Sequence, residues 1–172
     1  MNSTLIPEAL KILCCFIPIM LFLAFLKFLR TARFKGMLGE AFVKITAWFF
    51  LPRRIYRPLH NVTLPTRDGS TTQIDHIFIS RFGIFVVETK NMKGLIIGDE
   101  RQKQWTQQFS STSFTFQNPL HQNYRHVKVL EETLNVSPKM IHSVLVFVGK
   151  STFKSPMPPN VTQRSGYFRY IK

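Results

Sequence analysis

Three acidic residues of this sequence stand where a carboxylate is costly. The chain has 172 residues, of which only nine are Asp or Glu. Asp75 and Glu88 lie in segments rich in Ile, Val and Phe, and Glu40 lies within a helical apolar pattern. A carboxylate buried in such a place is unfavourable unless it is paired or binds a metal. These three residues are therefore candidates for a functional site.

The loop between the two apolar segments sets how their residues pair. Residues 80–83, Ser-Arg-Phe-Gly, join the segments 73–79 and 84–90 as in a β-hairpin. A hairpin centred on this loop places Asp75 directly opposite Glu88. Opposed residues point to one face with Cβ atoms about 4.5–5.5 Å apart, so both carboxylates can bind one cation. Lys90, two residues beyond Glu88, points to the same face.

This arrangement predicts a particular chemistry. Two carboxylates this close repel each other without a cation, and Mg²⁺, with Mn²⁺ as an alternative, suits carboxylate and water ligands. A lysine beside the metal can position a water molecule and stabilise the charge that develops at a scissile phosphate. Asp75, Glu88 and Lys90 thus indicate phosphodiester hydrolysis. The competing interpretation is that each is a solvated residue at a strand end, because an E-x-K pair is common by chance.

Composition excludes several other kinds of site. Cys14 and Cys15 are adjacent in an apolar run, so neither a disulfide framework nor a four-ligand zinc site can be assembled. The five histidines include no pair at helical metal-binding spacing, and His76 is better explained as a core residue than as a general base. The formal net charge of +14 favours a polyanionic partner, either nucleic acid or an anionic membrane surface.

The elements that position these residues follow from the apolar spacing. Leu38, Phe42, Ile45 and Phe49 form the stripe of an amphipathic helix over residues 36–51, ended by Pro52. A second helix begins at Pro119 with Asn118 as its N-cap. Strands are predicted at residues 56–65, 73–79, 84–90 and 142–148, with 94–98 continuing the sheet, a loop over 102–117 and a short strand near 167–171.

The amino-terminal segment predicts a membrane anchor. Residues 12–26 are uncharged and bounded by Lys11 and Lys27, and the wider apolar stretch is 5–29. The core covers about 22 Å, and terminal lysines can extend it. A cleaved signal peptide is the alternative, but no small-x-small cleavage site follows. The basic residues after the helix favour a single-pass protein of the cytoplasmic membrane with its carboxy-terminal domain in the cytoplasm.

The region from Gly36 to about Val148 resembles the NERD, or nuclease-related, domain, which is similar to the PD-(D/E)xK restriction-endonuclease-like superfamily. The motifs that carry the resemblance are GMLGE at 36–40, Leu64-Pro65 with Asp68-Gly69, QIDHIFIS at 73–80, GIFVVETKN at 83–91, Gly94, Trp105 and NPLHQN at 118–123. Ile74 replaces the proline that often precedes the aspartate, at the most variable position of the superfamily pattern.

The resemblance implies an α/β fold, with an αβββαβ core and a mixed sheet. It implies that Asp75 and Glu88 bind the metal, that Lys90 assists catalysis, that Glu40 supports the site and that Gln122 lies near it. The domains expected are an anchor at 1–30, a nuclease-like domain at 31–150 and a carboxy-terminal extension at 151–172 with a possible edge strand.

Three functional hypotheses follow. The first is a membrane-anchored, Mg²⁺-dependent nuclease acting on DNA, with RNA as the alternative substrate. The second is a tethered nucleic-acid-binding or interaction module without catalysis, and the third is an anchored scaffold whose basic patch meets anionic lipid. Arg125 and Lys128 are candidate phosphate contacts, or simply the solvated face of the second helix. Trp48, Phe49 and Phe50 are expected to pack against the sheet or lie near the membrane rather than stack on bases.

Overall fold

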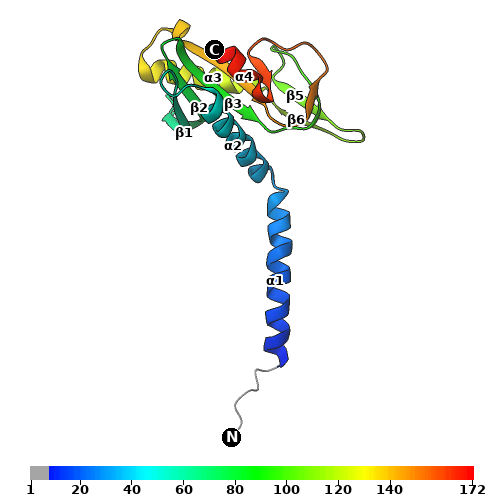
Figure 1. The fold of residues 1–172 in the computed structure, drawn as a ribbon. Coiled ribbons are helices and arrows are strands. Elements are labelled where there is room, and N and C mark those ends of the chain that lie inside the picture. The colour runs from blue at the N-terminus through cyan, green and yellow to red at the C-terminus, as the bar shows by residue number, and fades with distance from the viewer. Residues whose placement is uncertain (1–7) are drawn as a thin grey trace. The chain divides into compact units, whose positions relative to one another are not determined.

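The computed structural model of the chain describes residues 8–172 (Figure 1). It divides into two compact units, Met1–Met37 and Leu38–Lys172. The second unit contains all seven residues expected to form a site or contact nucleic acid.

The first unit is built around helix α1 (Glu8–Leu29), which includes Pro18. Thr31 ends this helix and begins the next, because its hydroxyl donates to the Phe28 carbonyl and accepts from the Phe34 N–H. The anchor predicted over residues 5–29 begins outside the described residues. Within residues 8–172, no helix is long and apolar enough to cross a membrane, so the expected transmembrane helix is not found there.

The main sheet has five strands in the order β1 (Arg57–Pro65), β2 (Thr71–Ser80), β3 (Gly83–Lys90), β7 (Ile141–Phe147) and β9 (Val161–Gln163). The first three pair antiparallel, whereas β7 pairs parallel with β3 and β9 parallel with β7. The predicted mixed sheet is confirmed. The main sheet and its helices follow the predicted order helix, three strands, helix, strand, but three further strands, which belong to a second sheet, precede the second of these helices.

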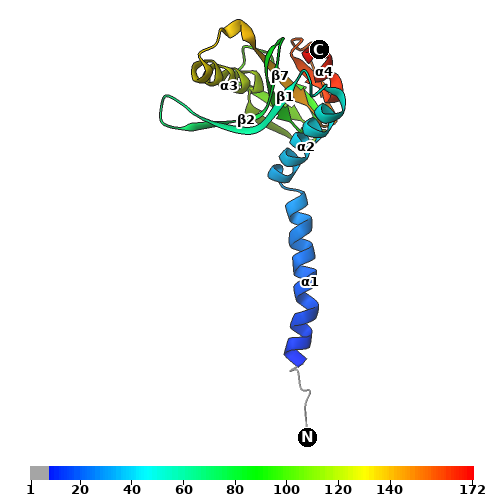
Figure 2. The same cartoon turned by 60° about the vertical axis from the view of Figure 1, so that its left-hand side comes forward.

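Helices cover both faces of this sheet, as Figure 2 shows. Helix α2 (Ala32–Phe50) and the short α4 (Tyr167–Ile171) pack on one face, against strand residues such as Phe78 and Val146. Helix α3 (Pro119–Leu134) packs on the other face through Val127 and Leu130. Asn118 caps α3 by accepting from the Leu120 N–H, as predicted.

The prediction of which face of α2 is buried is wrong. Leu38, Ile45 and Phe49 are more than half exposed, and the buried positions of α2 are Gly39, Val43 and Ala47. Small side chains on the buried face let the helix axis approach the sheet closely, and the larger apolar residues are left outside.

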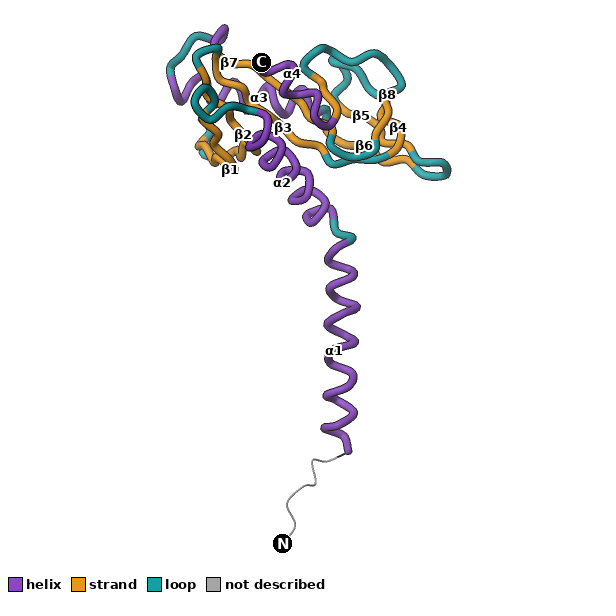
Figure 3. The backbone as a smooth tube through the Cα atoms, in the orientation of Figure 1, coloured by secondary structure: helices purple, strands orange, loops and turns teal. Residues whose placement is uncertain are grey.

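A second, smaller sheet replaces the loop expected over residues 102–117 (Figure 3). Its strands, in spatial order, are β6 (Ser113–Gln117), β5 (Gln104–Gln108), β4 (Gly94–Ile97) and β8 (Ser151–Phe153). Trp105 is completely buried and anchors this polar hairpin beneath Phe147 of the main sheet. Because β4 pairs here, the expectation that residues 94–98 continue the main sheet is also wrong.

The strand expected near residues 167–171 is instead helix α4. Tyr167 and Ile171 are four residues apart, so a helix turns both side chains into the core, where they are almost fully buried. The Tyr167 hydroxyl donates to the Val43 carbonyl at 3.0 Å and lies 2.8 Å from the Thr46 hydroxyl. Residues after 150 therefore complete the core beside α2.

Gly39 governs how closely α2 approaches the end of β3. A Cβ atom at this position would lie 2.9 Å from the Asn91 Cβ and 3.3 Å from the Thr89 Cγ2. Any larger residue would push α2 outward together with Glu40, the next residue. The glycine of the Gly-Glu motif thus brings an acidic side chain to the sheet.

We predict that Gly39→Ala lowers the free energy of unfolding by about 1–3 kcal/mol, because the added methyl overpacks this contact. Gly36→Ala in the same helix is the matched control, since a Cβ there meets nothing within 4 Å. It should be neutral or stabilise by up to ~1 kcal/mol through helix propensity. Urea unfolding of both variants decides the matter, and equal effects would contradict the packing role of Gly39.

Candidate active site

The candidate site forms where the β2–β3 ladder ends. The last backbone pair is His76 with Val87, so the next opposed residues are Asp75 and Glu88. This is the register that the hairpin loop predicted. The Asp75 Oδ2 accepts from the Thr89 N–H at 2.9 Å. The side chain of Asp75 thus takes over a backbone donor at the point where the strands stop pairing.

The other edge of β2 is interrupted at the same residue. The β1–β2 register passes from His60 with His76 to Val62 with Ile74, and skips the position where Asn61 faces Asp75. Asn61 has a positive φ of 54°. With its amide nitrogen towards α2, Asn61 donates to the Glu40 Oε2 at 3.1 Å, and its oxygen accepts from the Lys44 Nζ at 3.3 Å. Glu40 is therefore held beside the interruption.

Glu88 is the centre of a polar group that joins β3 to α3. Its side chain is 3% exposed, and its Oε1 accepts from the Lys90 Nζ at 2.7 Å. The same ammonium donates to the Gln122 Oε1 at 2.9 Å. The structure thus brings Glu88, Lys90 and Gln122 together on the α3 side of the sheet.

His126, one turn after Gln122, contacts the other oxygen of Glu88. Its Nε2 lies 3.3 Å from the Glu88 Oε2, within ion-pair range, and its Nδ1 lies 2.9 Å from the Thr72 hydroxyl. Both Nε2 and Oε2 are buried and lack a hydrogen-bond partner among the described residues. Glu88 therefore has one oxygen fixed by Lys90 and one oxygen with unused bonding capacity.

The two carboxyls differ in acidity. Burial, followed by the negative charges of Glu88 and Glu40, raises the pKa of Asp75 to about 7, against the opposing Thr89 N–H and Lys90 ammonium. Burial also raises the pKa of Glu88, but contacts with His126 and Lys90 outweigh it, and the net pKa is lowered. Near neutral pH an ionised Glu88 thus stands beside a carboxyl that gives up its proton reluctantly.

The carboxylate oxygens of this group fit the ligand preference of one hard divalent cation. Mg²⁺ in proteins is usually bound through one or two carboxylates and keeps several water ligands. Asp75 and Glu88 supply two carboxylates, and the Glu88 Oε2 is a buried oxygen that accepts no hydrogen bond among the described residues. Within residues 8–172, no group of three or more His, Cys, Asp or Glu side chains is placed to hold a metal. Water would therefore complete the coordination.

Two other candidates lie elsewhere on α3. The Arg125 guanidinium is 3.7 Å from the Asp68 carboxylate in the turn between β1 and β2, and both side chains are exposed. Lys128 donates to Glu131 at 2.6 Å and lies over the ring of Tyr124. Each is a surface cation with an acidic neighbour, and among the described residues no hydrogen bond or ion pair joins either to Glu88, Lys90 or Gln122.

Sequence reasoning missed His126 and Asn61. The helical spacing of four between Gln122 and His126 could have indicated that both face β3, although nothing in the sequence shows that β3 lies beneath them. Asn123 was also missed as a structural residue. Its buried amide donates to the carbonyls of Val86 and Val144 and so fixes α3 on the sheet.

Comparison with known proteins identifies a family for the part of the chain that contains this site. The family model described as the nuclease-related domain matches residues 35–148. An uncharacterised protein of Bacillus anthracis is 50% identical over 99 residues, which are 58% of this chain and 46% of the relative. The chain thus matches less than half the length of that relative. No solved structure matches the chain.

We predict that Asp75→Asn stabilises the protein at pH 8 in the absence of divalent cations. Because the pKa of Asp75 is raised in the folded protein, protonated Asp75 favours the folded state. This contribution to the free energy of unfolding is lost as pH rises from about 4, the pKa of Asp75 in the unfolded chain, through about 7, its pKa in the folded protein. The Asn oxygen can still accept from Thr89. The gain should be about 1–3 kcal/mol at pH 8, since partial solvent contact reduces the ~1.4 kcal/mol per pKa unit, and it should vanish near pH 4.

The measurement is urea unfolding with a chelator at both pH values. Glu132→Gln, which removes an exposed carboxylate paired with Arg67, is the control and should show no such gain at pH 8. A variant less stable than the parent at pH 8 would show that the Asp75 charge is well compensated without a cation.

Proposed function

Because this chain belongs to the nuclease-related domain family, within the restriction-endonuclease-like superfamily, we propose that it is a metal-dependent nuclease that hydrolyses phosphodiester bonds in DNA. The observation that carries this proposal is the buried Glu88 carboxylate beside Asp75. One Glu88 oxygen accepts from Lys90, whereas the other accepts no hydrogen bond among the described residues and has the His126 Nε2 3.3 Å away, within ion-pair range. Two buried carboxylates side by side repel each other, and this repulsion is costly in a fold unless a cation offsets it.

The residues of this group have distinct proposed roles. Asp75 and Glu88 would hold Mg²⁺, or Mn²⁺ in its place, and the bound ion would neutralise phosphate charge and acidify a water molecule. Lys90, one-fifth exposed, is positioned to place its ammonium beside the scissile phosphate and stabilise the developing negative charge. Gln122 orients Lys90 through their hydrogen bond. Glu40 acts at a distance, by raising the proton affinity of Asp75.

The proposal of nucleic acid as substrate is supported by charge. The net charge of +14 includes exposed cations on α3, among them Arg125 and partly exposed Lys128. Such residues bind phosphates without regard to base sequence. DNA is the proposed substrate, and a parallel assay with RNA distinguishes the two.

We predict that Glu88→Gln lowers Mg²⁺-dependent nicking of plasmid DNA by about 100-fold or more, because the ion loses one of its two charged ligands. DNA affinity should change by less than about threefold, since the residue contacts no surface cation of α3. Glu100→Gln in an exposed turn is the matched control and should cleave as the parent does.

The assay uses the full chain with Mg²⁺, with Mn²⁺ and with a chelator. If the parent binds DNA but neither ion supports cleavage, the catalytic proposal fails. The protein would then be a nucleic-acid-binding module with a nuclease-like fold.

We further propose that α1 attaches the chain to the cytoplasmic membrane, with Leu38–Lys172 on the cytoplasmic side. Support comes from the exposed apolar side chains between Phe16 and Phe28, which can enter the membrane interface, and from the basic residues that follow them, which attract anionic headgroups. We predict that a carboxy-terminal fusion is found with membranes and its reporter is active in the cytoplasm. Leu21→Asp with Phe22→Asp should release it, whereas Gln108→Asp should not. A parent found free of membranes would contradict the proposal.

A further inference from the structure

Helix α2 is apolar on two faces, although only one packs on the sheet. Val43 and Ala47 are buried against the core. Ile45, Trp48 and Phe49 lie on the outer side and are 57%, 56% and 69% exposed. We call these three residues the outer stripe. A helix that is apolar around its circumference normally has a second apolar neighbour, and a surface of this kind marks an interaction site.

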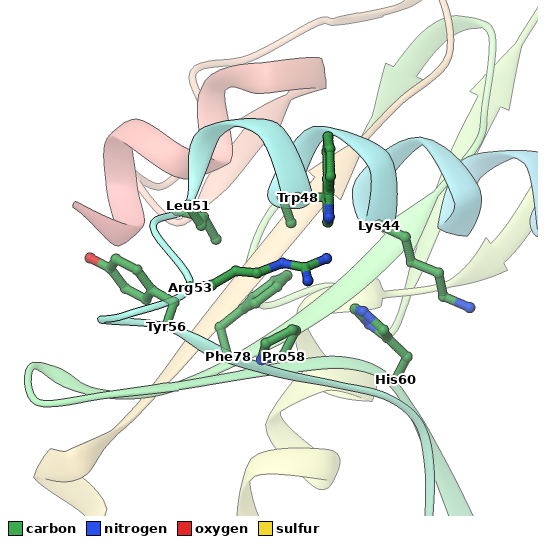
Figure 4. Close-up of a pocket in the computed structure, with 9 residues that line it drawn as sticks. Lys44, Trp48, Leu51, Arg53, Tyr56, Pro58, His60 and Phe78 are labelled. Atoms are coloured by element: carbon green, nitrogen blue, oxygen red, sulfur yellow. The ribbon is translucent and has the colours of Figure 1, made fainter.

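A pocket opens beside the outer stripe, between α2 and strands β1 and β2. Its volume is about 70 Å³. Trp48 forms part of its rim, and the rest of its apolar lining comes from Ala47, Leu51, Tyr56, Pro58 and Phe78. Lys44, Arg53 and His60 complete the lining, which contains no acidic residue. Figure 4 shows the Arg53 side chain extending below Trp48 towards Lys44 and His60.

The two positively charged side chains of this pocket, Lys44 and Arg53, interact only with uncharged groups in the contacts found for them. The Arg53 guanidinium lies 5.5 Å from the centre of the Trp48 ring, and Lys44 contacts the neutral amide of Asn61. Among the described residues, neither forms a salt bridge with a carboxylate. His60 is not one of these cations, because burial and then the positive charge of Lys44 lower its pKa. Its ring is a polar neutral group, and its Nδ1 lies 2.9 Å from the His76 Nδ1. Lys44 and Arg53 beside the apolar lining of the pocket are suited to bind a phosphate group.

The pocket and the candidate active site lie on opposite faces of the main sheet. Phe78, which lines the pocket, belongs to the core cluster under α2. Lys90 and Glu88 instead contact Gln122 and His126 of α3. A ligand held in the pocket would therefore leave the face with Glu88 open to solution.

We propose that the outer face of α2 rests on an anionic membrane, with a lipid phosphate in the pocket formed by Lys44, Arg53 and His60. The outer stripe favours lipid over nucleic acid, because Ile45 and Phe49 gain nothing from a phosphate backbone but are removed from water among acyl chains. Trp48 combines an apolar ring with an N–H donor, as is typical of residues at the membrane interface. Arg54, the residue after Arg53, is exposed and adds charge complementarity to anionic headgroups.

Tryptophan fluorescence tests this proposal because the chain has only two tryptophans, one exposed and one completely buried. In the full chain, Trp105→Phe leaves Trp48 as the single reporter. The parent is measured alongside, with buried Trp105 as a constant background. We predict that vesicles of phosphatidylcholine with phosphatidylglycerol shift Trp48 emission to shorter wavelength, and that brominated lipids in these vesicles quench it. Pure phosphatidylcholine should produce a much smaller change.

Charge variants separate the pocket from general attraction and from any binding through α1. Lys44→Gln with Arg53→Gln should reduce quenching of Trp48 by about fivefold or more at equal lipid, since each cation near the surface contributes about 1 kcal/mol. Lys103→Gln with Lys139→Gln removes the same charge from exposed positions elsewhere and should leave quenching within about twofold. Equal losses in both variants would overturn the role of the pocket.

Three results would overturn the proposal. In the first, chains that sediment with anionic vesicles keep solvent-like, unquenched Trp48 emission. In the second, DNA rather than vesicles changes Trp48 emission, and the pocket would then bind nucleic-acid phosphates. In the third, Trp48 emission shifts with protein concentration alone while light scattering reports a dimer, and the outer stripe would then be an interface between two copies of the chain.

Discussion

The candidate site depends on one hydrogen bond, from the Thr89 N–H to the Asp75 carboxylate. Backbone pairing between β2 and β3 stops at the preceding residues, and this bond satisfies the donor that the ladder leaves over. It also fixes the orientation of Asp75 beside Glu88. The same local opening of the sheet thus creates the site and prevents an unpaired buried N–H group. If β2 and β3 continued as an ordinary backbone-paired ladder beyond His76 and Val87, the Asp75 carboxylate would not be needed as the acceptor for the Thr89 N–H.

The charges around this opening are supplied by three separate elements. Lys90 of β3 and His126 of α3 hold Glu88 ionised, whereas Glu40 of α2 and Glu88 itself discourage ionisation of Asp75. The close approach at Gly39 brings Glu40 within range, and Asn123 keeps α3 on the sheet. A divalent cation would relieve the repulsion between the carboxylates without disturbing the bonds of Lys90 or Thr89. The packing of the fold is thus the basis of our proposal that a cation binds here.

Much of this could be predicted where local chemistry determines structure. The short loop after Ser80 sets the pairing register, so the opposition of Asp75 and Glu88 followed from the sequence. Asn118 and Pro119 marked the start of α3 for similar local reasons. The buried face of α2 was missed because apolar periodicity does not distinguish a core from a second interface. The β5–β6 hairpin was missed because only Trp105 is deeply buried within it, and His126 because its role requires knowing that α3 crosses β3.

The central claim is that Asp75 and Glu88 form one divalent cation site. Electron paramagnetic resonance of Mn²⁺ titrated into the full chain tests it most directly, because free and bound Mn²⁺ give distinct signals. We expect saturable binding that Mg²⁺ displaces in the parent and that is lost in the Asp75→Asn, Glu88→Gln double variant while its circular dichroism is unchanged. Equal Mn²⁺ binding by parent and double variant, or none by either, would contradict the claim.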